Sequence, residues 1–197
     1  MLTLRRLTSG ILNNINLHLE CSESVAVIGE SGSGKTTLLN AIAGYIHYEG
    51  DILFNGKNIN RIPVWRRNFR YLNQRLYLFP HKTIGNNLAL IEKNREIQLC
   101  LLEKFRIAHL IDRYPNELSG GEQQRAALVR TLIGKPDLLL LDEPFSSLDW
   151  DTRKHIWNEL KEIQRQMNVM ALIVTHEPQE ADFLANRKIQ LHHGIII

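Results

Sequence analysis

Long apolar runs are absent from this sequence, and that absence limits where the protein can act. A helix needs about 20 mostly apolar residues to cross a bilayer. The longest candidates, such as residues 138–141, are soon interrupted by charged residues. The N-terminal residues also lack the continuous apolar segment and small-residue cleavage site of a signal peptide. We therefore expect a chain that does not span a membrane and that stays in the cytoplasm.

Cysteine is scarce, and the sequence has no internal repeat, low-complexity tract or Pro/Gly/Ser-rich linker. Cys21 and Cys100 lie far apart and belong to no CxxC pair, so they indicate neither a zinc site nor a disulfide framework. Of the 197 residues, 44% are hydrophobic and 23% are charged, which excludes a disordered or fibrous chain. We expect one domain over residues 1–197.

Acidic residues are absent between Asp51 and Glu92, although the whole chain carries a net charge of only +3. One interpretation is an ordinary solvated face. Another is a surface that faces anionic lipid head groups or the acidic loops of a membrane partner. Nucleic acid is a weaker third interpretation, because the motifs of nucleic-acid-binding folds are missing. The basic residues of this segment are Lys57, Arg61, Arg66, Arg67, Arg70, Arg75 and Lys82.

Apolar runs of strand length alternate with helical patterns along the chain. Strands are predicted for residues 15–20, 25–28, 51–54, 69–74, 137–142 and 169–176, and a hairpin for residues 188–197. A helix is predicted after the strand at 25–28, several more over about residues 83–134, and an amphipathic one around Ile156, Leu160 and Ile163. This order predicts an α/β fold with a mainly parallel sheet, N-terminal antiparallel β strands and a small helical subdomain at about 83–134, inserted in the core.

A glycine-rich segment, GESGSGKT, joins the predicted strand at 25–28 to an apolar helix. Glycines let successive backbone N–H groups curl around phosphate oxygens, and the helix N-terminus adds partial positive charge. In this pattern Lys35 reaches the β- and γ-phosphates, and the Thr36 hydroxyl holds Mg²⁺. A chance glycine-rich turn is the alternative, and the position between strand and helix counts against it. The segment comprises Gly29, Glu30, Ser31, Gly32, Ser33, Gly34, Lys35 and Thr36, and Thr37 follows it.

Two further motifs also suit a bound nucleotide. In LSGGEQQR, Ser119 and Glu122 form a capping box that predicts a helix start, and two glycines leave its first N–H groups open to a ligand. In LLLLDEP, Asp142 and Glu143 end an apolar strand, where α/β sheets place their ligand sites. There Asp142 can bind the hydration shell of Mg²⁺, and Glu143 can polarise a water for attack on a γ-phosphate.

Taken in order, the motifs GESGSGKT, Gln74, LSGGEQQR, LLLLDEP, SSLD ending at Asp149, and His176 in VTHE resemble the ATP-binding subunits of ABC transporters. The resemblance covers nearly the whole chain, and LSGGEQ separates this family from other phosphate-loop ATPases. It implies a P-loop NTPase core. It also implies that residues 29–37 bind the triphosphate of ATP, and that Thr36, Gln74 and Asp142 form the Mg²⁺ and water environment.

The resemblance further implies an active ATPase. Glu143 would be the catalytic carboxylate, and His176 would contact the γ-phosphate. The active unit would be a head-to-tail dimer of this chain with a second copy or a homologous ATP-binding subunit. Asp149 would lie at that interface. The residues expected to contact ATP held by the opposite subunit are Ser119, Gly120 and Gly121.

Membrane partners are implied as well. The setting of Gln74 resembles the loop by which importer ATPases meet their transmembrane permease subunits, and FPHKTIGNN and DEPFSSLD resemble bacterial importers. A separate solute-binding protein and a peripheral location on the inner face of the cell membrane follow from that resemblance. The alternative is a soluble ABC-type ATPase acting on nucleic acid or ribosomes, although the coiled coils and tandem domains of such relatives are missing. A nucleotide-binding module without turnover is a third reading.

One family feature is missing. Family members carry an aromatic residue shortly before the second strand that stacks on adenine, but no Phe, Tyr or Trp precedes Tyr45 here. We expect Arg6, His18 or an aliphatic residue such as Leu12 to take its place, and GTP to be poorly excluded, because base stacking on an aromatic ring is worth about 1–3 kcal/mol.

Overall fold

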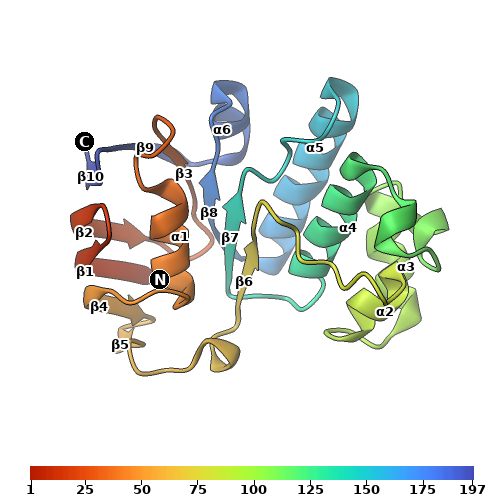
Figure 1. The fold of residues 1–197 in the computed structure, drawn as a ribbon, viewed down its shortest axis with the longest axis horizontal. Coiled ribbons are helices and arrows are strands. Elements are labelled where there is room, and N and C mark those ends of the chain that lie inside the picture. Colours follow the sequence, from red (N-terminus) through yellow and green to blue (C-terminus); the bar gives the residue numbers. More distant parts are fainter.

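A computed structural model describes all 197 residues of the chain. Its strands are β1 (Leu2–Ser9), β2 (Leu12–Leu19), β3 (Ser24–Ile28), β4 (Glu49–Phe54), β5 (Lys57–Asn58), β6 (Phe69–Leu72), β7 (Leu138–Asp142), β8 (Met170–Val174), β9 (Arg187–His192) and β10 (Ile195–Ile196). Its α-helices are α1 (Lys35–Ala43), α2 (Ile84–Ala89), α3 (Arg95–Lys104), α4 (Gly120–Leu132), α5 (Trp150–Met167) and α6 (Pro178–Leu184). Figure 1 shows the antiparallel strands at one end, the parallel strands in the middle and α2 and α3 at the other end.

The N-terminal sheet is antiparallel, as predicted, with the strand order β2-β1-β4-β5. In β2 the alternating residues Ile15, Leu17 and Leu19 are buried, which confirms the period-two pattern. Strand β1 was not predicted from the sequence. Its pairing with β2 shifts register between Leu4 and Leu7, and this irregularity interrupts the alternation by which a strand is recognised.

The second sheet has the order β10-β9-β3-β8-β7-β6, and all its neighbouring strands are parallel except β10 with β9. Strands β7 and β8 are buried along their whole length, which explains their continuous apolar runs. Because β3, β8 and β7 are neighbours and parallel, the segments that follow Ile28, Val174 and Asp142 emerge at the same edge. These three segments form the candidate site.

Each face of the parallel sheet packs against a different set of helices. In β7, Leu138 and Leu140 join a core shared with α1 and the antiparallel sheet. Leu139 and Leu141 point into a second core, shared with α5, α4 and the helical region beyond. In Figure 1, α1 accordingly lies between the two sheets, and α4 and α5 cover the opposite face. The parallel sheet is therefore held rigidly from both sides, as a site on its edge requires.

The segment predicted as helical, 83–134, contains α2, α3 and α4. Side chains of Thr83, Asn94 and Ser119 cap the starts of these three helices by accepting backbone N–H groups. Helix α5 buries Ile156, Leu160 and Ile163 as its amphipathic pattern predicts. No helix of the chain combines the length and the apolar character needed to cross a membrane.

Candidate functional site

A polar cleft of about 420 Å³ lies at the shared edge of β3, β7 and β8. It brings together the phosphate loop, Gln74, the acidic pair and His176, which lie as much as 147 residues apart between Gly29 and His176 in the numbering of the chain. Its walls are formed by Ile11, Gly29, Ser31, Gly32, Gly34, Lys35, Thr36, Thr37, Gln74, Asp142, Glu143, Val174 and His176.

The phosphate loop runs from the end of β3 to the start of α1, as predicted. Gly34 has a φ of 107° and precedes the helix, a conformation that side chains rarely adopt. The Lys35 ammonium donates to the carbonyl oxygens of Gly29, at 2.7 Å, and Glu30, at 2.8 Å. The loop is thus wrapped around a positive charge at a helix N-terminus, which is the electrostatic setting for a phosphate group. Glu30 and Ser33 belong to the loop but do not line the cleft.

Asp142 is 2% exposed at the end of β7. Its Oδ2 accepts hydrogen bonds from the hydroxyls of Thr36, at 2.9 Å, and Tyr71, at 3.3 Å. Its Oδ1 is buried without a partner. Burial raises the pKa of this carboxyl, although the Thr36 and Tyr71 bonds act in the opposite direction. A buried carboxylate oxygen with a free lone pair beside a hydroxyl fits a hard, oxygen-binding cation such as Mg²⁺.

Glu143 and His176 lie in contact across the ends of β7 and β8. The Nδ1 atom of His176 is 2.7 Å from Oε2 of Glu143, and the side chains are 69% and 18% exposed respectively. Glu143 has a φ of +52°, an uncommon conformation for a residue with a side chain. Its N–H donates to the carbonyl of Val174 at 3.0 Å, and its own carbonyl accepts from Gln124 Nε2 at 3.0 Å. The surrounding structure thus fixes an otherwise unfavourable backbone.

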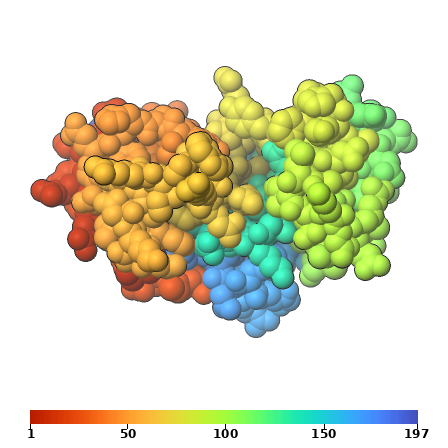
Figure 2. Space-filling view, turned by 90° about the horizontal axis from the view of Figure 1, so that it is seen from below, coloured from red at the N-terminus to blue at the C-terminus, as the bar shows by residue number.

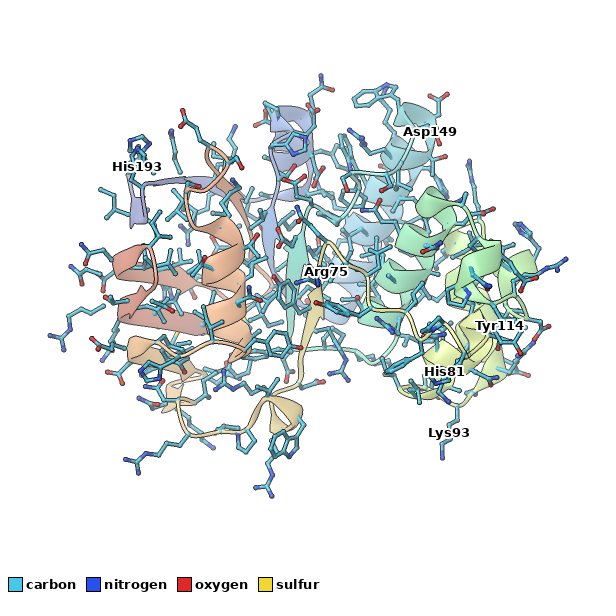
Figure 3. All side chains as sticks on the ribbon, in the orientation of Figure 1. Arg75, His81, Lys93, Tyr114, Asp149 and His193 are labelled. Carbon is cyan, nitrogen blue, oxygen red and sulfur yellow. The ribbon has the colours of Figure 1, made fainter.

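Gln74 follows β6 on an irregular segment that borders the cleft. Two later residues of this segment, Leu76 and Tyr77, have φ values of 56° and 48°. The Arg130 guanidinium on α4 donates to both of their carbonyl oxygens at 2.8 Å. This fixes the segment against the helical region, and Figure 3 shows the neighbouring Arg75 near the centre of the molecule.

The structure does not bring Ser119, Gly120, Gly121 or Asp149 into the cleft. Ser119 forms the predicted capping box: its N–H donates to Glu122 Oε2 at 2.8 Å, and its Oγ accepts from the Glu122 N–H at 3.4 Å. Asp149 caps α5 by accepting the Thr152 N–H at 3.0 Å. Figure 3 places Asp149 at the outer end of α5. None of these four residues lines the cleft of their own chain.

Three residues at the site were not predicted from the sequence. Tyr71 bonds Asp142, and burial beside that carboxyl raises the pKa of the Tyr71 hydroxyl. Gln124 is 4% exposed on α4 and bonds both Glu143 and Ser147, through Nε2 and Oε1. Ile11, 46% exposed, borders the cleft. Of these three residues, only Gln124 could have been noticed in the sequence, because its amide falls on an otherwise apolar face of the predicted helix.

The structure places none of the three residues named as substitutes for the adenine-stacking aromatic in the lining of the cleft. Leu12 is 1% exposed, and none of Arg6, Leu12 and His18 lines the cleft. The ring of His18 bonds Thr3 and Glu20 instead. Ile11, in the turn between β1 and β2, is the residue that reaches the cleft from this part of the chain.

The basic segment also needs one correction. Arg67 is 8% exposed, so it does not belong to a solvated or partner-facing surface. Its guanidinium donates to the carbonyl oxygens of Ile42, Ile59 and Ile62. It therefore cross-links backbone segments around the end of α1. Arg61, Arg66 and Arg75 are exposed.

The chain matches a family model described as ABC transporter over residues 12–146. Among curated relatives, the spermidine/putrescine import ATP-binding protein of Haemophilus influenzae (strain Rd) is 40% identical over 195 residues, covering 94% of this chain and 52% of the relative. The sulfate/thiosulfate import ATP-binding protein of Salmonella typhimurium is 38% identical over 199 residues, covering 94% and 54%. The chain thus spans about half the length of the curated relatives it matches.

Solved structures agree over the whole chain. The dimeric structure of MJ0796, described as a bacterial ABC transporter cassette, superposes with a TM-score of 0.90 at 29% identity and covers 100% of this chain and 96% of that one. A post-hydrolysis state of the same cassette bound to ADP and Pi gives the same TM-score. Fold and cleft define the class as an ATP-binding cassette built on a phosphate-loop core. The chain belongs to the ABC transporter family.

Proposed function

We propose that this chain is an ATP-hydrolysing subunit that energises a membrane transporter of the importer type. The observation that carries the proposal is the cleft, in which the phosphate loop, Asp142, Glu143 and His176 meet at the ends of three adjacent parallel strands. Residues 29–37 bind the triphosphate through backbone N–H groups, the N-terminus of α1 and the Lys35 ammonium. Binding exchanges the two carbonyl contacts of Lys35 for phosphate oxygens.

The Thr36 hydroxyl and the Asp142 carboxylate would hold Mg²⁺, with Gln74 at the edge of the site. When bound, the ion neutralises charge on the β- and γ-phosphate oxygens. Support comes from the 2.9 Å Thr36–Asp142 contact and from the buried, unpartnered Oδ1 of Asp142. Tyr71 fixes the orientation of this carboxylate through its hydroxyl.

Glu143 polarises the attacking water and accepts its proton. His176 holds the Glu143 carboxylate through Nδ1, and its exposed ring reaches the γ-phosphate from the mouth of the cleft. Because the backbone of Glu143 is held by Val174 and Gln124, the carboxylate needs little reorganisation at the moment of attack.

Base selectivity is weak in this proposal. Ile11 offers the nucleotide an aliphatic surface with no hydrogen-bonding group, so adenine and guanine meet the same contact. The lining of the cleft contains no Phe, Tyr or Trp on which a base could stack.

A second subunit completes each site. Ser119, Gly120, Gly121 and Asp149 lie outside the cleft of their own chain, and the N-terminus of the 13-residue helix α4 is suited to a phosphate brought by another copy. A head-to-tail pair would place this helix end over the partner's phosphate loop. The similarity to a cassette solved as a dimer supports this arrangement.

The permease binds in a larger groove of about 710 Å³, between the end of α1 and the segment after β6. Figure 2, seen from below, shows a hollow between the lobe near residue 50 and the lobe near residue 90. Tyr45 and Tyr77 line the groove and are 61% and 62% exposed, which suits the apolar side of a docked helix. Exposed Arg66 and Arg75 lie in the acid-free segment of the chain and favour acidic residues on that partner.

Relatives of nearly equal identity are named for the import of spermidine/putrescine and of sulfate/thiosulfate. A separate solute-binding protein and a peripheral position on the inner membrane face complete the proposal. Affinity purification of the chain from solubilised membranes, followed by assay of phosphate release, tests it. Recovery of a transmembrane partner and ATP turnover are expected, whereas recovery of ribosomes or nucleic acid would favour the soluble alternative.

A further inference from the structure

A third, much smaller cavity of about 50 Å³ adjoins the Glu143–His176 pair. We call it the inner chamber. It is bounded by the segment after β7, the first turn of α5, the segment after β8 and α6. Its walls are Glu143, Phe145, Ser146, Arg153, Thr175, His176, Glu177 and Glu180. Glu180 belongs to none of the motifs found in the sequence.

Glu180 presents a carboxyl group to this chamber from α6 while being only 4% exposed. Its Oε1 atom has no hydrogen-bond partner. Burial is the main cause that raises the pKa of Glu180 to about 8, and the charges of Glu143 and Glu177 act in the same direction. A hydrogen bond from Thr175 and the charge of Arg153 oppose the shift. The carboxyl is therefore mainly a neutral acid at pH 7.

Arg153 faces Glu180 across the same chamber. Its Nε is buried and has no partner, while its Nη2 donates to the carbonyl of Leu148 at 3.1 Å. The backbone N–H of Arg153 separately makes the first helical bond of α5, to the carbonyl of Asp149 at 2.9 Å. One side chain thus connects the inner chamber to the segment that ends at the α5 cap.

The inner chamber is large enough for a water molecule, and its unpartnered Glu180 Oε1 and Arg153 Nε atoms provide the polar partners that a buried water requires. A water that bridges the Glu180 carboxyl and the Arg153 guanidinium would connect α6, next to the loop of His176, to the first turn of α5. We propose that Glu180 is a positioning residue: together with Arg153 it fixes the Glu143–His176 pair relative to the Leu148–Asp149 segment. The inference deepens the proposed ATPase function and rests on it.

A purely structural role explains this arrangement poorly. A buried carboxyl with one oxygen that no protein group bonds costs stability, and an apolar side chain of similar size would avoid that cost. Such a group persists in a core when its position serves the neighbouring site. Replacing Glu180 should therefore separate turnover from stability.

The test compares Glu180→Leu and Glu180→Gln with Asp182→Asn as the matched control. Asp182 lies on the same helix but is exposed and pairs with Lys188 on the surface. Turnover, nucleotide affinity and melting temperature are measured on the same preparations. For Glu180→Leu we expect kcat to fall by about tenfold or more, because a small displacement of a reacting group is costly. Nucleotide affinity should stay within about twofold and the melting temperature should not fall.

Glu180→Gln keeps the shape and hydrogen bonds of the neutral acid, so its turnover at pH 7 should remain within about threefold of wild type. Above pH 8 the wild-type carboxyl ionises beside Glu143 and Glu177 and facing Arg153, so wild-type turnover should decline there while that of Glu180→Gln stays flat. Arg153→Met should lose turnover as Glu180→Leu does, and the double variant should lose no more than either single variant.

Wild-type turnover in Glu180→Leu, or parallel losses of turnover and melting temperature in both Glu180 variants, would overturn the inference. Absence of wild-type ATP hydrolysis would instead overturn the proposed function. The two failures are therefore distinguishable in one set of assays.

Discussion

The imidazole of His176 lies 2.7 Å from the carboxylate of Glu143, Nδ1 to Oε2, at the ends of neighbouring parallel strands. Each residue is held by a different strand, so their contact depends on the β7–β8 register. The pair lines two cavities, the cleft and the inner chamber. A change on either side of the pair should therefore affect turnover.

Removal of the phosphate-loop ammonium should abolish tight nucleotide binding. Lys35→Ala deletes the cation that the loop encloses, and we expect ATP affinity to fall by about 10- to 150-fold, since hydrogen bonds to charged groups contribute about 1.5–3 kcal/mol. The same ATP concentration should raise the melting temperature of Lys35→Ala clearly less than that of wild type. The control Lys57→Ala removes an exposed ammonium outside the cleft and should retain the shift. An equal ATP-induced shift in Lys35→Ala would contradict this placement of the triphosphate.

An aromatic residue at position 11 should create base stacking. Ile11→Trp supplies a ring at the edge of the cleft, and stacking worth about 1–3 kcal/mol would raise ATP affinity by about 5- to 150-fold. Competition between ATP and GTP for fluorescent nucleotide bound to wild type should give affinities within about tenfold of each other. A strong wild-type preference for ATP would show that another residue reads the base.

A charge placed in the groove should separate ATP turnover from partner binding. Tyr77→Asp puts a carboxylate on the apolar lining of the groove. This carboxylate is unfavourable beside the apolar side of the proposed partner helix and repels its acidic residues. Phosphate release by the isolated chain should stay within about twofold, while recovery of the permease from membranes should fall by about tenfold. Tyr114→Asp is the matched control, because Tyr114 is exposed at the far end of the helical region (Figure 3). Equal recovery with both variants would place the permease elsewhere.

The stability of the fold should depend on pH through Glu180. Its pKa is raised from 4.5 to about 8, so the folded state holds a proton that the unfolded chain releases. The contribution of Glu180 to the free energy of unfolding is therefore fully present below pH 4.5. It is lost as the pH rises to about 8, because the unfolded chain releases the proton more readily. Measured by urea unfolding, Glu180→Gln should gain stability relative to wild type over this interval. A constant difference between the two proteins would show that Glu180 is ionised in both states.

Much of the fold and site could be predicted because their signals are local. The buried strands β3, β7 and β8 are continuous apolar runs, and the phosphate loop and the Ser119 cap are short motifs whose spacing reflects backbone geometry. Strand β1 was missed because its register irregularity interrupts the alternation of buried and exposed residues. Arg67 looked like a surface charge because its three carbonyl partners come from other segments. Glu180 and Ile11 acquire their surroundings only from tertiary packing, which local patterns do not encode.

The measurement that tests the central claim most directly is phosphate release from ATP by the purified chain with Mg²⁺, compared with Glu143→Gln. The variant keeps the size of the side chain but removes the proton acceptor, so turnover should fall by about 100-fold or more while ATP binding stays within about threefold. Glu162→Gln, which neutralises a half-exposed carboxylate of α5 outside the cleft, should match wild type. Turnover in Glu143→Gln equal to that of wild type would contradict the assignment of hydrolysis to this cleft.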